Sequence, residues 1–215
     1  MLCGMMIVVI STALLSRRLP TWSIAPILEV SRNRMTICLM KLYLMRHART
    51  NYNELDLCND DPARDVYVTT EGVEQAEVVA EWLREMPIER IVTSELPRTR
   101  QTAEIVNRCH RVAIEAHSGI NDIRSGFDGR PVAEYYAAIS DDPLRIRVNG
   151  GESLLDHKAR VLAFIDWLKV RPEKHMLVVA HAETLRVFRA WFEGIEDERM
   201  RELEFGNCEV LVYEV

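Results

Sequence analysis

Two histidines and two arginines follow short apolar segments of the chain, which makes them candidates for one shared site. Arg46 and His47 come directly after one apolar segment, and His181 comes directly after another. Arg98 lies a few residues beyond a third. Arginine presents a planar, permanently charged fork that matches phosphate oxygens, and a neutral imidazole is a competent nucleophile toward phosphorus. Together these side chains suit the binding of a dianionic phosphoryl group.

Other interpretations of these side chains stay open. A single histidine after a strand is more often structural than catalytic, and an arginine is often only a surface residue. Two histidines can also be zinc ligands, but no third ligand stands at helix or hairpin spacing, and the arginine beside His47 opposes metal binding. Joint placement beside arginine favours the phosphoryl site, so the sequence predicts no metal and no cofactor.

The elements that must position these residues alternate along residues 41–215. Short apolar segments predict strands at 41–45, 90–93, 112–116, 175–180 and 209–213. Amphipathic segments predict helices at 70–85, from 94 onward, 132–139, 152–169 and 184–192, with Thr70 and Ser94 as caps. This order predicts an α/β fold, a three-layer sandwich with a mostly parallel central sheet and helices on both faces. Ligands of such sheets bind beyond the carboxyl ends of the strands, where the two histidines fall.

Residues 119–151 hold five of the eight glycines of the body, together with Pro131 and Pro143, and predict a long loop with one short helix. Long loops on a compact scaffold are often substrate lids. Its charged and aromatic side chains either read a second anionic group or form an ordinary solvated loop. The residues concerned are Arg124, Phe127, Arg130, Arg145 and Arg147.

Composition excludes several classes of protein. With 48% hydrophobic residues, the 215-residue chain can bury a core of its own, so disorder of the whole chain is excluded. The net charge of −6 argues against a nucleic-acid partner. Five cysteines lie far apart without a CxxC pair, which predicts free thiols in a reducing, cytoplasmic compartment.

Residues 1–40 differ from the body. The apolar stretch at the start is too short to span a bilayer comfortably, and Arg17 and Arg18 follow it rather than precede it as in a signal peptide. It is either a weak membrane anchor, a poor signal peptide or an extension from an upstream start codon. The last is favoured, because Met35 and Met40 stand just before the first clear strand. We therefore expect a poorly ordered extension at 1–40, one domain at 41–215 and no membrane partner.

Several ordered motifs resemble the histidine phosphatase superfamily, in the branch that includes cofactor-dependent phosphoglycerate mutases. The segment Leu44–Asn53 is similar to the Arg-His-Gly signature of that family. Further similar blocks follow in family order: Thr69–Ala76, Thr93–Ala103, Gly150–Ser153 and Val178–Ala182. The resemblance covers most of residues 41–213 and implies the family's α/β fold.

The resemblance also implies a role for each matching residue. His47 would be the nucleophile that becomes a phosphohistidine. The phosphoryl oxygens would be bound by Arg46, Asn53, Arg98, His181 and the main-chain amide of Ala182. The family's proton donor follows the third strand, where Asp122 stands, and Asp128 in a later family-like element is the second choice.

The sequence departs from the family pattern at three of these places. Alanine replaces the usual glycine after each histidine, at Ala48 and Ala182, and a methyl group predicts only a slightly tighter pocket. The donor is an aspartate, one methylene shorter than the usual glutamate.

The predicted function is a metal-independent phosphatase for a small phosphomonoester or a phosphohistidine. Two alternatives are a phosphoglycerate mutase-type phosphoryl transfer and an inactive phosphate-binding protein. Mutases of the family look longer, whereas only 34 residues (215 − 181) follow His181 here, which favours hydrolysis. The sequence predicts neither the substrate nor the oligomeric state.

Overall fold

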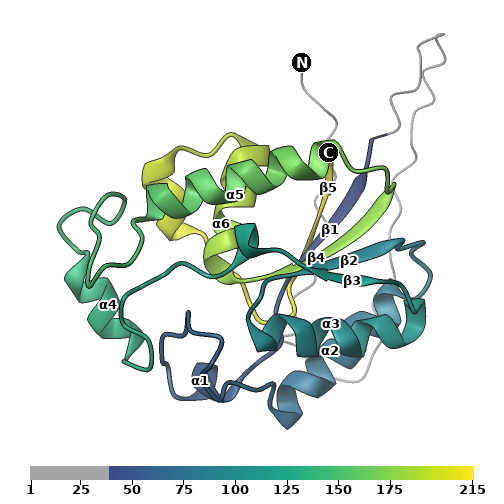
Figure 1. Cartoon of the computed structure of the whole chain (residues 1–215), viewed down its shortest axis with the longest axis horizontal. Coiled ribbons are helices and arrows are strands. Elements are labelled where there is room, and N and C mark those ends of the chain that lie inside the picture. The colour runs from purple at the N-terminus through teal and green to yellow at the C-terminus, as the bar shows by residue number, and fades with distance from the viewer. Residues whose placement is uncertain (1–38) are drawn as a thin grey trace, which may run out of the picture.

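The central element of the computed structural model, which describes residues 39–215, is a five-stranded sheet (Figure 1). The strands lie in the order β3-β2-β4-β1-β5. Neighbours among the first four are parallel, and β5 is antiparallel to β1, so the predicted mostly parallel sheet is confirmed. The strands are β1 (Lys41–Arg46), β2 (Arg90–Thr93), β3 (Ile114–Ala116), β4 (His175–Ala180) and β5 (Val210–Glu214). The expectation for residues 1–40 falls almost entirely outside the described residues.

Helices cover both faces of the sheet, as the three-layer prediction requires (Figure 1). The α-helices are α1 (Asn51–Glu54), α2 (Thr70–Leu83), α3 (Pro97–His110), α4 (Val132–Ala138), α5 (Leu154–Lys169) and α6 (Ala182–Glu193). Two 3-10 helices, η1 (Ser118–Ile120) and η2 (Asp197–Glu202), complete the described chain. Helices α5 and α6 lie on one face of the sheet, and α2 and α3 lie on the other (Figure 1).

Strand β1 shows why both faces are covered. Successive side chains of a strand point to opposite faces of the sheet. Leu42 and Leu44 join the core cluster under α5 and α6, whereas Tyr43 and Met45 join the cluster under α2 and α3. All four side chains are at most 1% exposed, so the strand is buried on both faces, as expected in a parallel sheet between helices.

The strand register brings the candidate residues together. Arg46 is opposite Ala180, and Thr93 is opposite Val179, so β1, β4 and β2 end at one edge of the sheet. The residues that follow these strands therefore converge there, although they are far apart in sequence.

Several predicted helix ends shift by a few residues. Thr69, not Thr70, caps α2 by accepting the amide of Gly72. Gly72 is required at that place, because a Cβ there would lie 2.2 Å from the carbonyl oxygen of Arg49. Ser94 does not cap α3: the N-cap position is Leu96, since Pro97 fixes the first turn. Helix α2 ends at Leu83, before Pro87 is reached.

The long loop packs against the segment that follows β1. The Cys58 amide donates to the Arg130 carbonyl at 2.8 Å, and the Gly129 amide donates to the Cys58 carbonyl at 2.8 Å. A small apolar cluster of Cys58, Phe127, Tyr135 and Ile139 fills the space behind these bonds. The loop thus forms a wall with its own core, in which α4 covers residues 132–138 of the predicted 132–139.

Two further features concern the helices and the cysteines of the described residues. Within residues 39–215, no helix is both long enough and apolar enough to cross a membrane. Cys58, Cys109 and Cys208 are all free thiols, and Cys58 and Cys208 are buried.

Candidate active site

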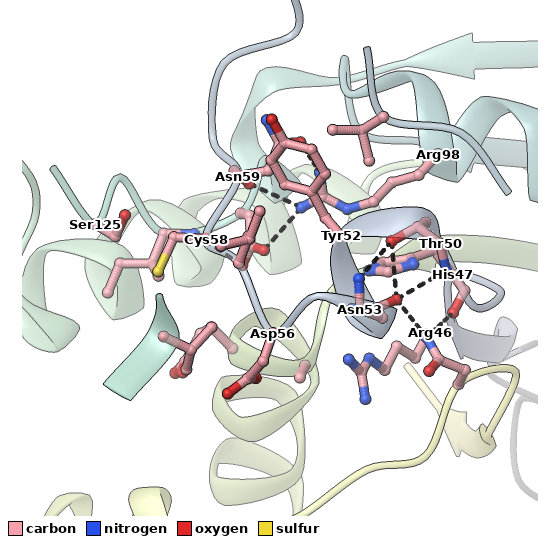
Figure 2. A pocket seen from close by; sticks show the side chains of 18 of the residues that line it. Arg46, His47, Thr50, Tyr52, Asn53, Asp56, Cys58, Asn59, Arg98 and Ser125 are labelled. Atoms are coloured by element: carbon pink, nitrogen blue, oxygen red, sulfur yellow. Dashed lines mark hydrogen bonds and ion pairs between the residues drawn. The ribbon is translucent and has the colours of Figure 1, made fainter. Parts of the chain in front are cut away.

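A cavity of about 360 Å³ lies at the carboxyl edge of the sheet. Figure 2 shows side chains from the β1–α1 segment, the start of α3 and the long loop arranged around it. Six of the predicted site residues line the cavity: Arg46, His47, Asn53, Arg98, Asp122 and Ala182. His181 does not line it, because its side chain is completely buried behind the cavity wall.

The His47 ring is oriented by its own backbone neighbour. Its Nδ1 lies 2.8 Å from the carbonyl oxygen of Ala48, and a carbonyl can only accept, so Nδ1 carries the proton and donates it. The lone pair is therefore on Nε2. Burial lowers the pKa of His47 well below its usual value, and Arg98 and Arg46 lower it further. The ring is thus neutral and nucleophilic at physiological pH.

Two guanidinium groups, that of buried Arg98 and that of partly buried Arg46, make the cavity cationic. Arg98 is the second residue of α3 and is 4% exposed. Its Nη1 donates to the side-chain oxygen of Asn59, and its Nη2 donates to the Asn59 carbonyl at 3.1 Å (Figure 2). Arg46 ends β1 and donates through Nη1 to the Phe205 carbonyl, whereas its buried Nε has no hydrogen-bond partner among the described residues. A buried donor without an acceptor is costly, and an anion in the cavity would satisfy it.

His181 is held behind His47. The two ring centroids are 5.3 Å apart. His181 Nε2 lies 2.8 Å from the hydroxyl oxygen of Ser94, and its buried Nδ1 has no hydrogen-bond partner among the described residues. Burial lowers the pKa of His181 well below its usual value, with Arg98 as the next cause, so this ring is also neutral.

Ser94 contacts His181, and the prediction that it caps the following helix is wrong. When its hydroxyl donates to Nε2, the proton of the neutral ring resides on Nδ1, the atom that faces Asp122 and the cavity side. Ser94→Ala should therefore lower kcat/KM about tenfold, because the ring loses the partner that fixes its tautomer.

The control for this prediction is Thr93→Val. The neighbouring Thr93 hydroxyl is buried without a hydrogen-bond partner among the described residues, so the isosteric change removes a hydroxyl that binds nothing. It should leave kcat/KM within about twofold, as expected when no hydrogen bond is lost. Equal losses in both variants, measured as initial rates of phosphate release, would show that the effect is only packing.

Asp122, the predicted proton donor, lines the cavity beside Arg98 and His181. Its Oδ2 accepts from Arg98 Nη2 at 2.9 Å and lies 3.6 Å from His181 Nδ1. Its Oδ1 accepts the amide of Ile123 at 3.0 Å. Burial raises the pKa of Asp122, and the charge of Arg98 opposes that rise. The carboxyl group is therefore prepared to hold a proton when an anion draws Arg98 away.

Asp128, the second-choice donor, is in a different environment. Its Oδ1 accepts from the side chain of Asn59 and from the amides of Asp60 and Asp61, and its Oδ2 is bound by Arg64. It does not line the cavity. Although burial opposes it, these hydrogen bonds lower the pKa of Asp128, so this carboxylate stays ionised.

Asn53 and the start of α6 supply further donors. Asn53 Oδ1 accepts from the amide and hydroxyl of Thr50 and, at 3.3 Å, from Asn207, so its amide nitrogen is the end left for a ligand. Ala182 is the first residue of α6, whose free amides and dipole favour an anion at that end. Neither Ala48 nor Ala182 has a positive φ, so alanine is unstrained where the family has glycine.

The arginines of the long loop do not line the cavity. Each arginine singled out there is paired with a carboxylate elsewhere: Arg124 with Glu152, Arg130 with Glu134, Arg145 with Asp142 and Arg147 with Asp156. None of them lines the cavity, nor does Phe127. Of the two interpretations of this loop, the structure supports the one without a second anion site in these residues.

Other lining residues were not predicted. Asn59, Tyr52, Tyr136 and Arg186 line the cavity, and Asn207 Nδ2 donates to the His47 carbonyl at 3.0 Å. For Asn59 the sequence offers a signal in the run from Asn59 to Asp61, followed by proline, because such runs form side-chain-capped turns. Among residues 39–215, no three His, Cys, Asp or Glu side chains are grouped to hold a metal ion.

Known proteins are similar to this chain in sequence and in fold. A curated relative from Proteus mirabilis named "Probable phosphoglycerate mutase GpmB" is 27% identical over 184 residues, 80% of this chain and 83% of the relative. The solved alpha-ribazole phosphatase from Shigella flexneri has a TM-score of 0.71 at 24% identity and covers 78% of this chain and 87% of its own. A solved mycobacterial glucosyl-3-phosphoglycerate phosphatase in complex with VO3 has a TM-score of 0.67 at 21% identity. The match covers 82% of this chain and 97% of that protein's chain. Residues 42–215 match the histidine phosphatase superfamily (branch 1).

Proposed function

Because the chain belongs to the histidine phosphatase superfamily (branch 1), we propose that it is a metal-independent phosphatase that hydrolyses a small phosphomonoester through a phosphohistidine on His47. The observation that carries the proposal is the orientation of that ring. Its Nδ1 donates to the Ala48 carbonyl, so the unprotonated Nε2 is left for the cavity that Arg46 and Arg98 also line.

The first step forms the covalent intermediate. His47 Nε2 attacks phosphorus, the ester P–O bond breaks, and Asp122 gives its proton to the departing alcohol oxygen. Arg46, Arg98 and the first amides of α6 bind the phosphoryl oxygens and stabilise their charge during transfer. Positioning and electrostatic stabilisation provide most of the rate enhancement in phosphoryl transfer, and this cationic pocket supplies both from its own side chains.

The second step releases phosphate. Water attacks the phosphorus of the phosphohistidine, the N–P bond breaks, and Asp122 takes the proton from the water. In the free protein Asp122 is paired with Arg98 at 2.9 Å. A bound phosphoryl group competes for that guanidinium and brings negative charge close to the carboxyl group, and both effects favour its protonated form. Substrate binding thus prepares the donor.

A second candidate function is phosphoryl transfer of the mutase type, which the name of the curated relative favours. A mutase must shield its phosphohistidine from water and recapture the intermediate, whereas a phosphatase admits water.

The cysteine pattern also leads us to propose a reducing, cytoplasmic compartment for the protein.

Mass balance on a panel of phosphomonoesters, with a chelator present, separates these functions. We expect free inorganic phosphate to appear in step with the free alcohol, undiminished by the chelator. An isomerised ester without phosphate release would identify a mutase. A panel without either product, from protein that still binds inorganic phosphate, would identify an inactive binding protein and overturn the proposal.

A further inference from the structure

Asp128 does not line the cavity, yet its carboxylate accepts several hydrogen bonds from the chain beside it. Its Oδ1 accepts from Asn59 Nδ2 at 3.1 Å and from the amides of Asp60 and Asp61 at 3.0 and 3.2 Å. Its Oδ2 is bound by Arg64. Every contact of this carboxylate is thus with residues 59–64, the turn that lies over Arg98.

The side-chain amide of Asn59 is held between two groups of opposite kinds. A carboxylate can only accept hydrogen bonds, and a guanidinium can only donate them. Asn59 therefore turns its Nδ2 toward Asp128 and its Oδ1 toward Arg98 Nη1. If the amide were reversed, its NH2 group would face the donors of Arg98 and its oxygen would face the acceptor oxygen of Asp128. Asp128 thereby fixes which end of Asn59 meets the arginine.

The backbone also holds this turn over the arginine. The Asn59 carbonyl accepts from Arg98 Nη2 at 3.1 Å, beside the Asp122 carboxylate on the same nitrogen. Asp60 accepts the amide of Ser125 at 2.7 Å and its hydroxyl at 3.0 Å, which joins the turn to the opposite wall. Arg98 thus donates to the turn through both terminal nitrogens, and one of them, Nη2, also donates to the candidate proton donor.

We propose that Asp128 is a positioning residue, which aims Arg98 at the phosphoryl group through the side-chain amide of Asn59. The inference rests on the proposed function in that the ligand of Arg98 is a phosphoryl group. The charge of Asp128 also acts on the Arg98 guanidinium. Asp128→Asn separates the two effects, because it removes the charge and keeps an acceptor oxygen for Asn59.

The test is the affinity for inorganic phosphate, measured by titration calorimetry, because this readout needs no turnover. Asp128→Ala should weaken phosphate binding about tenfold, the usual effect of misplacing one strong charge-assisted hydrogen bond. Asn59→Ala should weaken it to a similar extent, and the double variant should be no weaker than Asn59→Ala alone. Asp128→Asn keeps an acceptor oxygen for Asn59 and should restore binding to within about threefold of wild type.

Arg64→Ala is the matched control. It removes the other partner of Asp128 from a half-exposed site and leaves Asn59 untouched, so phosphate binding should stay within about twofold. Thermal melts of all variants show which of them fold, and Asn59→Ala tests the relay even where Asp128→Ala does not fold.

Three results would overturn the inference. They are unchanged phosphate affinity in Asn59→Ala, an equal further loss when Asp128→Ala is added to Asn59→Ala, and equal losses in Asp128→Asn and Asp128→Ala. Wild-type protein that binds no phosphate would overturn it as well. Wild-type protein that shows the expected affinities but hydrolyses no ester would leave the relay standing and refute the proposed phosphatase.

Discussion

Replacing His47 with alanine should lower kcat at least about 10⁴-fold, the scale seen when a covalent nucleophile is removed from an enzyme. The ring is the group with an unprotonated nitrogen at the cavity, and its low pKa keeps that nitrogen unprotonated. His181 cannot replace it, because the His181 side chain is completely buried and its Nε2 lies 2.8 Å from the Ser94 hydroxyl. Single-turnover phosphate release from wild type and variant measures the effect.

Phosphate binding provides the control for the His47 prediction. Arg46 and Arg98 remain in the variant, so its affinity for inorganic phosphate should stay within about tenfold of wild type, since charge-assisted contacts dominate such sites. Loss of turnover with binding retained assigns His47 to the chemical step. A variant that keeps more than a tenth of wild-type kcat would contradict the covalent mechanism.

Asp122→Asn should lower kcat about 10² to 10³-fold with an alkyl phosphate, the usual contribution of a general acid. An aryl phosphate such as p-nitrophenyl phosphate releases a weakly basic oxygen that needs little protonation, so its loss should be about tenfold at most. The comparison of the two esters separates proton donation from damage to the site, because a misplaced Arg98 would slow both equally.

The pH dependence of kcat/KM gives a second readout of the role of Asp122. Its pKa is raised by burial, and the donor must be protonated, so kcat/KM should fall as pH rises through that raised pKa. His47 must be neutral to attack, and its pKa is lowered. On the acid side, kcat/KM should therefore fall only at pH values well below the usual pKa of histidine. In Asp122→Asn the alkaline decline should disappear. A variant profile that keeps the decline would assign it to another group.

The convergence of the site could be predicted from the sequence because it depends on topology. Arg46, His47 and His181 follow β1 and β4, and parallel strands that pair in register must end side by side. The apolar segments that define those strands are among the strongest patterns in the chain. Arg98 could be placed for the same reason, since Pro97 fixes the start of α3 just beyond β2.

The remaining parts depend on contacts between loops, which no periodicity encodes. Asn59 contacts Arg98 from a segment whose neighbours, Asp56 and Cys58, form backbone hydrogen bonds with the long loop. Phe127 and Tyr135 of that loop pack against each other. Ser94 has the residue type and position of a helix cap, and only the structure shows its hydroxyl on His181.

The choice between the two candidate proton donors also depends on contacts between loops that the sequence does not reveal. Asp122 and Asp128 are both acidic residues of a glycine-rich loop, and the sequence could only rank them. Their environments differ in space: one carboxylate faces Arg98 at the cavity, and the other is fully occupied by residues 59–64. Opposite pKa shifts follow from these environments.

The covalent mechanism is tested most simply by quenching the reaction with base within a few turnovers and locating the phosphoryl group by mass spectrometry. We expect one phosphoryl group on the His47 ring, stable in base and lost in acid, and absent from His47→Ala. A phosphoryl group on another residue, or rapid ester hydrolysis with no labelled protein at any time point, would contradict the mechanism.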